Sequence, residues 1–413
     1  MNIWLINPFS DLPNEGASEG RFCCLARMLV EQGHHVTWWT VDFHHRTKAR
    51  REPVFEGGKE EKWEGNRGGS CQIFLLPVPG YKKNISFARV RSHRAYGREF
   101  AKTAEARIAE GERPDVIHLS TPPLDCIAPV LQLRQRIGCR VTVDVMDLWP
   151  ETFYRTLPQG LRCLGKILFA PLHGAAKRAY KEADGISAVS QEYLDHVSEV
   201  RGRGSGVGSQ PSDLHLCYVG GERLPAPCSA PHAPRFLYVG AMTPTYDLPT
   251  ILEAAESLQK DGHRFEVWFA GGGVSEPVLK AEVERRQLSG TVKFLGFLNQ
   301  EELKDVLGRA DVGLNAINPG AYITMPHKLS DYLCAGLAVI NSTTGEPAEL
   351  LRQADAGCTY TAGHVASLRA GMKHYINQPE ALEQQRENAR QLAQKYFDRN
   401  KTYSAMIDFI LGK

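Results

Sequence analysis

The feature that most constrains the fold of this chain is a regular alternation of short apolar strands with amphipathic helices. In the first half, a helix with apolar residues at helical spacing begins near Phe22 and ends at Gly33. The same pattern predicts strands at 3–6, 36–41, 116–119, 141–145 and 186–189. Strands that alternate with helices form parallel sheets, so the sequence predicts an α/β fold.

The alternation starts again in the second half of the chain. It predicts strands at 236–239, 265–269, 292–295, 312–314 and 338–340, and helices at 248–260, 278–287, 301–307 and 327–334. Between the halves, residues 201–234 are rich in Gly, Ser and Pro, which is typical of a linker or a mobile loop region. We therefore predict two doubly wound Rossmann-like domains, at 1–200 and 235–395, that face each other across a cleft.

Composition and charge exclude several classes of function. The 413 residues carry 49 basic and 47 acidic side chains, and this balance indicates no general affinity for nucleic acid. The ten cysteines form no C-x-x-C pair and no cluster with histidine at zinc spacing, which favours reduced thiols. Met1 leads directly into the first predicted strand, and no apolar run approaches membrane-spanning length. We expect a cytoplasmic protein whose contact with a membrane is peripheral.

Common cofactor motifs are missing where they would be expected. No G-x-G-x-x-G follows the first strand, the glycines at 271–273 lack that spacing, and there is no Walker A sequence. No Asp-x-Asp pair occurs, although metal-dependent sugar transfer usually relies on one. We therefore expect neither a bound cofactor nor a metal ion.

The most informative stretch is 325–340. Pro326 suits the first turn of a helix, Gly336 suits its end, and a buried strand follows. Lys328 and Asp331 stand three residues apart on one helical face. A cation near a helix N-terminus opposes the helix dipole, which implies a nearby anion. The alternative is a solvated ion pair.

Several pieces of the chain, taken in order, resemble the family 4 retaining glycosyltransferases of GT-B architecture, especially the bacterial branch that builds surface polysaccharides. These pieces are residues 16–21, 33–36, 147–151, 183–190, 238–240, 294–296 and 328–336. The resemblance implies an acceptor-binding first domain and a second domain that binds a nucleotide sugar. It also implies that the last segment, 396–413, returns to the first domain.

The same resemblance assigns the donor site. Asp331 would bind the ribose hydroxyls, and Lys328, Leu329 and the amides at the helix start would face the diphosphate. In the loop that begins at Gly240, the hydroxyls of Thr243 and Thr245 would replace the Arg and Lys that are usual in the family. The chain also departs from the family at two positions, where Ile323 and Met146 replace a usual Glu and a usual His.

Catalytic candidates follow a strand of the first domain. Asp147 and Glu151 are the polar candidates beside the acceptor, although Asp147 could instead cap the next helix. Gly16, Gly20 and Arg21 form a loop that would approach a diphosphate or the acceptor, with an ordinary turn as the alternative.

A basic segment at 81–98 carries no acidic residue. Lys82, Lys83, Arg89 and Arg91 lie there among apolar side chains, which suits an anionic membrane surface or the diphosphate of a polyprenyl-linked acceptor. A solvated helix is the alternative. We predict that the protein transfers a sugar, with retention, from a nucleotide diphosphate donor, expected to be UDP, to a lipid-linked or saccharide acceptor in cell-surface polysaccharide synthesis. The alternatives are a nucleotide-sugar epimerase and a non-catalytic protein that binds sugar nucleotides.

Overall fold

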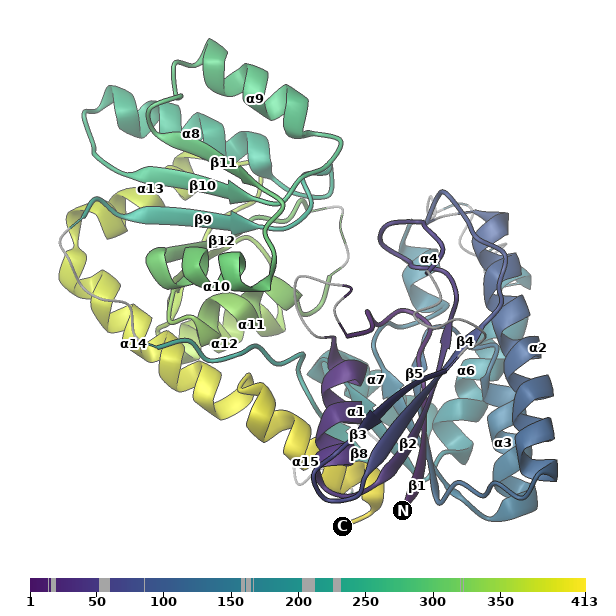
Figure 1. Ribbon diagram of the computed structural model, residues 1–413. Helices are drawn as coiled ribbons and strands as arrows, with labels where there is room; N and C mark the ends of the chain where they lie inside the picture. The colour runs from purple at the N-terminus through teal and green to yellow at the C-terminus, as the bar shows by residue number, and fades with distance from the viewer. Residues whose placement is uncertain are drawn as a thin grey trace. The chain divides into compact units, whose positions relative to one another are not determined.

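A computed structural model of the chain describes residues 1–13, 15, 20–51, 60–84, 86–156, 160, 165, 167–202, 212–225, 232–319, 321 and 323–413, without the side chains of 60–63 and 154–156. The chain divides into two compact units. Unit 1 contains the described residues up to Cys217 together with Tyr403–Lys413, and unit 2 spans Tyr218–Thr402. Each unit is built on a sheet with helices packed around it (Figure 1).

Unit 1 contains an eight-stranded sheet in the order β3-β4-β2-β1-β5-β6-β7-β8. All neighbouring strands are parallel except the edge pair β3 and β4. The strands are β1 (Asn2–Ile6), β2 (His35–Val41), β3 (Glu60–Glu64), β4 (Ser70–Leu76), β5 (Val116–Thr121), β6 (Arg140–Val145), β7 (Gly185–Ala188) and β8 (Leu214–Leu216). Strand order reverses between β1 and β5, and open parallel sheets bind ligands at such a switch point.

The helices of unit 1 bury the apolar faces that their sequences predict. They include α1 (Arg21–Glu31), α2 (Phe87–Ala109), α3 (Ile127–Ile137), α4 (Glu151–Thr156), α6 (Ala170–Glu182) and α7 (Gln191–Val200). In α1, Phe22, Leu25 and Leu29 recur at helical spacing and are fully buried. Helix α15 (Arg399–Leu411) adds Met406, Ile407 and Ile410 to the same hydrophobic core.

Unit 2 contains a six-stranded, fully parallel sheet in the order β11-β10-β9-β12-β13-β14. Its strands are β9 (Arg235–Val239), β10 (Glu266–Ala270), β11 (Val292–Gly296), β12 (Val312–Asn315), β13 (Ala338–Asn341) and β14 (Gly357–Thr359). Its helices include α8 (Leu248–Lys260), α9 (Glu276–Arg285), α10 (Gln300–Arg309), α11 (His327–Cys334), α12 (Glu346–Ala354), α13 (Val365–Asn377) and α14 (Pro379–Tyr396). The switch point of this sheet lies between β9 and β12.

The two parallel α/β sheets confirm the predicted fold class. The structure differs from the sequence analysis toward the edges of the sheets, where the edge strands β3 and β14 and the strand β4 beside β3 were not predicted. The proposed linker is also more ordered than expected, because residues 214–216 within it form β8, the last strand of the first sheet. No helix in the described ranges combines the length and the apolar character that crossing a bilayer requires.

Candidate functional site

Glycine-rich loops follow β9 and β10 at the carboxyl ends of these strands in the unit 2 sheet. Gly240, Gly271 and Gly273 all have positive φ angles, of 138°, 124° and 155°. A Cβ atom on Gly271 would collide with the carbonyl oxygen of Gly240, and one on Gly273 would collide with that of Met242. Glycine is therefore required here, because the two loops run against each other and exchange hydrogen bonds such as Met242 N to Gly272 O, at 2.9 Å.

Lys328 extends from the first turn of α11 toward the loop that begins at Gly240. Its ammonium nitrogen lies 4.1 Å from the ring centre of Tyr238 and 4.0 Å from that of Tyr246. The Nζ atom is buried and has no hydrogen-bond partner among the described residues. An ammonium group carries three N–H donors, and aromatic faces satisfy its charge only in part. The arrangement therefore leaves a buried cation in need of an anion.

Burial also changes the protonation of Lys328. Loss of solvent lowers the pKa of its ammonium to about 7. A cation so desolvated, at the switch point of a parallel sheet, is a typical candidate for a binding site. Tyr238 and Tyr246 were not predicted as site residues, and only their positions at the end of β9 and in the loop that follows could have suggested them.

Asp331 lies one turn further along α11 and is half-buried. No hydrogen bond or ion pair of its carboxylate is found within the described part of the chain, and it does not pair with Lys328. Burial raises the pKa of Asp331 to about 6, although the charge of Arg399 opposes the shift. The solvated Lys–Asp ion pair considered as the alternative is therefore absent from the residues described.

The other predicted donor residues differ in what they can offer a ligand. Thr243 is half-buried and Thr245 is exposed, and both lie in the loop after β9. Asn318 N donates to the carbonyl of Thr245 at 3.0 Å, which ties this loop to the one after β12. The side chain of Leu329 is fully buried, and its amide donates to Pro326 O at 3.0 Å. Contact between Leu329 and a nucleotide sugar is therefore still a prediction. Ile323 is half-buried.

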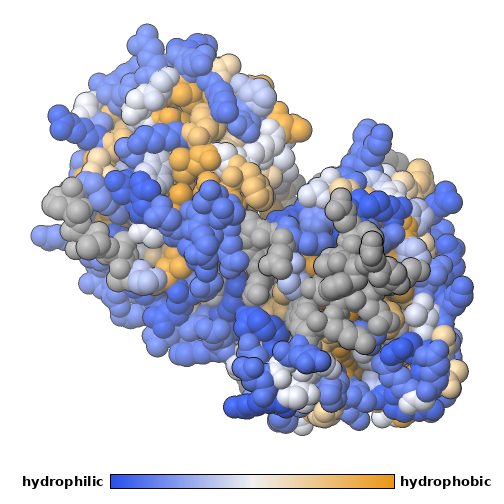
Figure 2. Space-filling view, viewed as in Figure 1, coloured by the Kyte–Doolittle hydropathy of each residue, from blue (hydrophilic) through white to orange (hydrophobic). Residues whose placement is uncertain are grey.

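Exposed apolar side chains flank the glycine loops. Val274 is 79% exposed, Val278 65% and Phe297 75%. Figure 2 shows hydrophobic surface gathered on unit 2 around α9 and β11. The loops after β10 and β11 are joined by a hydrogen bond from Gly271 N to Gly296 O, at 2.7 Å. The loops at the carboxyl ends of these unit 2 strands therefore combine a buried cation with exposed apolar side chains.

The two predicted catalytic carboxylates of unit 1 have different surroundings. Asp147 accepts hydrogen bonds from the Thr152 hydroxyl at 2.7 Å and from the Trp149 indole at 3.1 Å. These bonds hold the turn that leads into α4. Both donors are side chains, so they are not the backbone cap that was considered as the alternative, and a role beside the acceptor stays a prediction. Glu151 lies 3.2 Å from His173 Nδ1 and 3.8 Å from His196 Nε2. Its Oε2 is buried without a partner in the described residues.

Arg21, the first residue of α1, is occupied by partners within unit 1. The Arg21 guanidinium is buried in an ion pair with Asp144 at 3.0 Å and also donates to Cys217 O. It therefore points into the core of unit 1, whereas the sequence analysis predicts that it faces a diphosphate or the acceptor. Gly20 precedes α1 with an ordinary negative φ, and Gly16 lies outside the described residues.

The basic segment separates into two groups. Lys82, Lys83 and Arg91 are exposed, whereas Arg89 is half-buried. The Arg89 guanidinium lies over three aromatic rings, with its Cζ 5.2 Å from the ring centre of Trp149. Arg89 therefore packs in a cluster of aromatic side chains, and the exposed group forms a separate surface.

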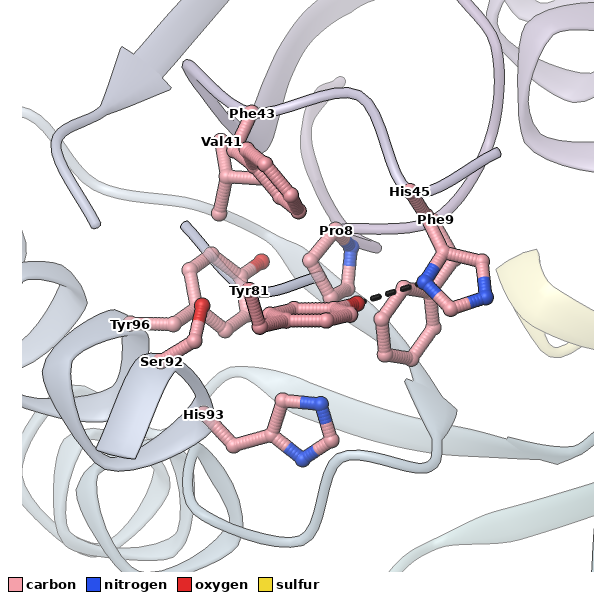
Figure 3. Close-up of a pocket in the computed structure, with 9 residues that line it drawn as sticks. All are labelled: Pro8, Phe9, Val41, Phe43, His45, Tyr81, Ser92, His93 and Tyr96. Atoms are coloured by element: carbon pink, nitrogen blue, oxygen red, sulfur yellow. Dashed lines mark hydrogen bonds between the residues drawn. The ribbon is translucent and has the colours of Figure 1, made fainter. Parts of the chain in front are cut away.

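Two of these rings, Phe9 and Tyr81, also line a small pocket next to the loops after β1 and β2 and the start of α2. Its lining residues are Pro8, Phe9, Val41, Phe43, His45, Tyr81, Ser92, His93 and Tyr96 (Figure 3). His45 Nδ1 and the Tyr81 hydroxyl are 2.5 Å apart. Burial is the main cause that lowers the pKa of His45 to about 4 and that of His93 to about 3, so both rings are neutral at pH 7.

One group of possible metal ligands was found among the described residues. Asp11, Glu15 and His44 bring one ligand atom each within 4.8 Å of one another. These atoms already have partners, because Arg46 pairs with Asp11 at 2.5 Å and Arg51 pairs with Glu15 at 2.9 Å. Two arginines against two carboxylates leave little charge to attract a cation, so the group does not fit a metal well.

Comparisons with known protein families cover both units. The family described as Glycosyl transferases group 1 matches residues 229–392, and the Glycosyl transferase 4-like domain matches residues 17–206. An amylovoran biosynthesis glycosyltransferase of Erwinia amylovora is 32% identical over 144 residues, which are 34% of this chain and 35% of that protein. A glycogen synthase of Mycobacterium tuberculosis is 22% identical over 232 residues, 55% of this chain and 54% of its own. The chain thus spans about a third to a half of these curated relatives.

Solved structures resemble the whole chain. Sucrose-phosphate synthase from Thermosynechococcus elongatus aligns with a TM-score of 0.69 at 17% identity, covering 98% of this chain and 97% of that one. HepE from Anabaena, in complex with UDP, aligns with a TM-score of 0.66 at 13% identity over 100% of both chains. These likenesses establish the fold. Since the two family matches together account for most of the chain and agree with that fold, the chain belongs to the family 4 glycosyltransferases of GT-B architecture.

Proposed function

We propose that this protein transfers a sugar, with retention, from a nucleotide diphosphate donor, best represented by UDP-sugars, to a lipid-linked or saccharide acceptor. The observation that carries the proposal is Lys328, a buried ammonium group that lacks an anionic partner in the described residues at the switch point of unit 2. A nucleotide diphosphate supplies that anion. Two of the similar proteins support the details, because one is a glycosyltransferase of amylovoran biosynthesis and another was solved with UDP.

In this proposal, unit 2 holds the donor. Lys328 and the start of α11 bind the diphosphate, and the carboxylate of Asp331 accepts hydrogen bonds from the ribose hydroxyls. The hydroxyls of Thr243 and Thr245 add donors from the loop after β9. The exposed Phe297 and Val274 offer an apolar surface that suits the flat face of a nucleobase.

The reaction needs charge stabilisation more than a strong base. An acceptor hydroxyl attacks the anomeric carbon on the face from which the diphosphate leaves, and the proton of that hydroxyl passes to the departing oxygen. Lys328 and the dipole of α11 stabilise the negative charge that develops on the leaving group, without a metal ion. Tight positioning of the two substrates contributes the rest. Asp147 and Glu151 remain candidates for contact with the acceptor, with Asp147 shaping the turn that presents it.

Unit 1 would receive an acceptor at a membrane surface. Phe87 is 95% exposed, Val90 47%, Ile167 74% and Leu168 72%. Ring contacts from His93 through Trp149 and Phe153 to Phe169 link the start of α2 to the segment beside Leu168. Exposed Lys82, Lys83 and Arg91 accompany these apolar side chains, a combination that favours peripheral binding to an anionic leaflet. It would keep the enzyme on the cytoplasmic face, close to a polyprenyl-linked acceptor.

Incubation of the purified protein with UDP-glucose, UDP-galactose and UDP-N-acetylglucosamine tests the proposal. Each donor is supplied alone and then with a mixture of polyprenyl diphosphate-linked sugars. Transfer of sugar to the lipid only when acceptor is present supports the transferase. Epimerised sugar nucleotide in the absence of acceptor would identify an epimerase, and saturable binding without any turnover would identify a non-catalytic binding protein.

A further inference from the structure

Two cations of unit 1 contact the same aromatic ring. Lys48 Nζ lies 4.8 Å from the ring centre of Tyr81, and Arg89 Cζ lies 6.0 Å from the same centre. Both cations also bond to Asn84, since Lys48 donates to its side-chain oxygen at 2.6 Å and Arg89 donates to its carbonyl at 3.0 Å. Two like charges are thus held together by a shared neighbour.

Neither cation has a carboxylate partner in the described part of the chain. Arg89 donates from Nε to His93 Nε2 at 3.3 Å and from Nη1 to the carbonyl of Asn84. Its Nη2 has no partner among the residues described. Lys48 donates to Asn84 and to the carbonyl of His45, which leaves the third of its three N–H donors. The pair therefore presents unused donors and two positive charges that form no ion pair with the described residues.

The surroundings make this arrangement costly in the absence of a ligand. Burial, and then the charge of Arg89, lower the pKa of Lys48, and burial also lowers the pKa of Arg89. Of the groups that face the pair, Asp147 and Tyr81 favour the charge of Arg89 without forming an ion pair with it. Neutral His45 and His93 add no compensating negative charge. An anion would relieve both the repulsion and the loss of solvent.

The cavity next to the pair limits what can occupy it. Its volume is about 10 Å³, room for about one water molecule, and Phe9, Val41 and Phe43 form apolar walls (Figure 3). A sugar ring cannot enter such a space. The ligand must therefore lie outside the cavity and direct one compact charged group to Arg89 and Lys48.

We propose that Arg89 and Lys48 form an anion subsite in unit 1 that binds a phosphoryl or carboxylate group carried by the acceptor. The inference deepens the proposed glycosyltransferase function and rests on it, because that function identifies the ligand as the acceptor. It restricts the acceptor to molecules with a negative charge close to the sugar, such as a sugar diphosphate or an acidic sugar. Neutral sugars would lack the contact.

Binding measurements without turnover test the subsite. The full chain carrying Lys328→Gln, which removes the unpartnered cation of unit 2, is titrated by calorimetry with pyrophosphate, with glucuronate and with glucose. We expect at least one of the two anions to bind, and glucose to bind at least about tenfold more weakly. In this background, Arg89→Gln or Lys48→Gln should each weaken anion binding about tenfold, as loss of a charge-assisted contact predicts.

Arg98→Gln is the matched control, because Arg98 is an exposed cation of the same helix, and its anion affinity should stay within about twofold. Pyrophosphate binding would indicate a phosphoryl source and glucuronate binding a carboxylate source. Equal losses in Arg98→Gln and Arg89→Gln, unchanged affinity in both Gln variants of the pair, or no anion binding at all would each overturn the subsite. If circular dichroism shows that Arg89→Gln is unfolded, Lys48→Gln carries the test against the same Arg98→Gln control. Sugar transfer is not measured here, so the subsite and the proposed function can fail separately.

Discussion

Within the part of the chain that the structure describes, both units hold cations that form no ion pair, but they accommodate those cations differently. In unit 2, a single ammonium group, Lys328, is buried between two tyrosine rings. In unit 1, Arg89 and Lys48 are half-buried, both contact the ring of Tyr81, and they repel each other. A lone buried lysine can relieve its desolvation by giving up its proton, whereas an arginine cannot.

Because of this difference, the two sites should respond differently to an anion. The pKa of Lys328, about 7, means that ligand binding in unit 2 is coupled to uptake of a proton. The charge of Arg89 is permanent, so the contact that Arg89 would make in the proposed subsite of unit 1 involves no such coupling. The expected outcomes that follow test this contrast.

The largest effect is expected for Lys328→Gln. Loss of the ammonium removes its charge-assisted bonds to the diphosphate, and the affinity for a UDP-sugar should fall about 10- to 100-fold by calorimetry. Lys395→Gln is the matched control, because Lys395 also lies over a tyrosine in unit 2, 4.8 Å from the ring centre of Tyr396, but is exposed. Arg89→Gln should leave UDP-sugar affinity within about twofold, and an equal loss there would abolish the distinction between the units.

Asp331→Ala should weaken UDP-sugar binding by at least about tenfold, because the ribose hydroxyls lose a charged acceptor. The pKa of about 6 adds a second criterion. Below that pH the carboxylate of the unmodified protein takes up a proton, so its affinity should decline, while the affinity of the variant should not change for this reason. Unaltered affinity in a folded variant would contradict the ribose assignment.

The pH dependence of unit 2 follows from Lys328. Above about pH 7 the free protein increasingly holds a neutral amine there, so UDP-sugar affinity should fall by up to about tenfold per pH unit. In Lys328→Arg this decline should disappear, since a guanidinium keeps its proton. The folded pKa also lies below the ordinary 10.5, so the unfolded chain binds more protons between these values, and the unliganded protein should gain stability as pH rises through this range. Thermal melts at pH 7 and pH 9 measure that gain.

The exposed cations of unit 1 should act on membranes with smaller individual effects. Lys83→Gln should weaken binding to anionic liposomes about fivefold, because each basic residue contributes about 1 kcal/mol near an anionic leaflet. Lys102→Gln, at an exposed position further along α2, is the control. Salt at 1 M shortens the Debye length to about 3 Å and should release the protein. Equal pelleting with neutral and anionic liposomes, or none with either, would mean that these residues serve another purpose.

Addition of a chelator should leave the rate of sugar transfer unchanged, which is the smallest effect expected. If side-chain cations stabilise the leaving group, sugar transfer should continue in EDTA at its full rate. Loss of turnover that magnesium or manganese restores would instead place a metal ion in the donor site, and Lys328 would then need a different explanation.

The sequence predicted the elements that bury a regular apolar pattern. The bounds of α8 and α11 agree with the predicted 248–260 and 327–334, because Pro at one end and a polar or glycine exit at the other mark both helices. Edge strands such as β3 escaped, since Glu60–Glu64 has charged residues where a central strand would carry apolar ones. Short-range pattern thus specifies the core better than the margins of the sheets.

The candidate sites were less predictable for a related reason. Lys328 and Asp331 lie within one helix, so their sequence spacing identified them together. The environment of Lys328 depends on Tyr238 and Tyr246, which approach it only through the fold. Arg89 looked like its exposed neighbours in sequence, and Arg21 looked like a loop residue, although Asp144, which pairs with it, is 123 residues away. Burial and distant partners decide such roles, and no local pattern encodes them.

The path of the backbone has a consequence for synthesis of the protein. The chain leaves unit 1 at Cys217, builds all of unit 2, and returns at Tyr403, after which Met406, Ile407 and Ile410 enter the hydrophobic core of unit 1. On the ribosome, the nascent first unit must therefore wait with an open core until the final helix emerges, although most of its residues were made long before. Chaperones that cover apolar surface would meet this chain during that interval, and a premature stop codon just before Tyr403 would damage the part of the protein that was translated first.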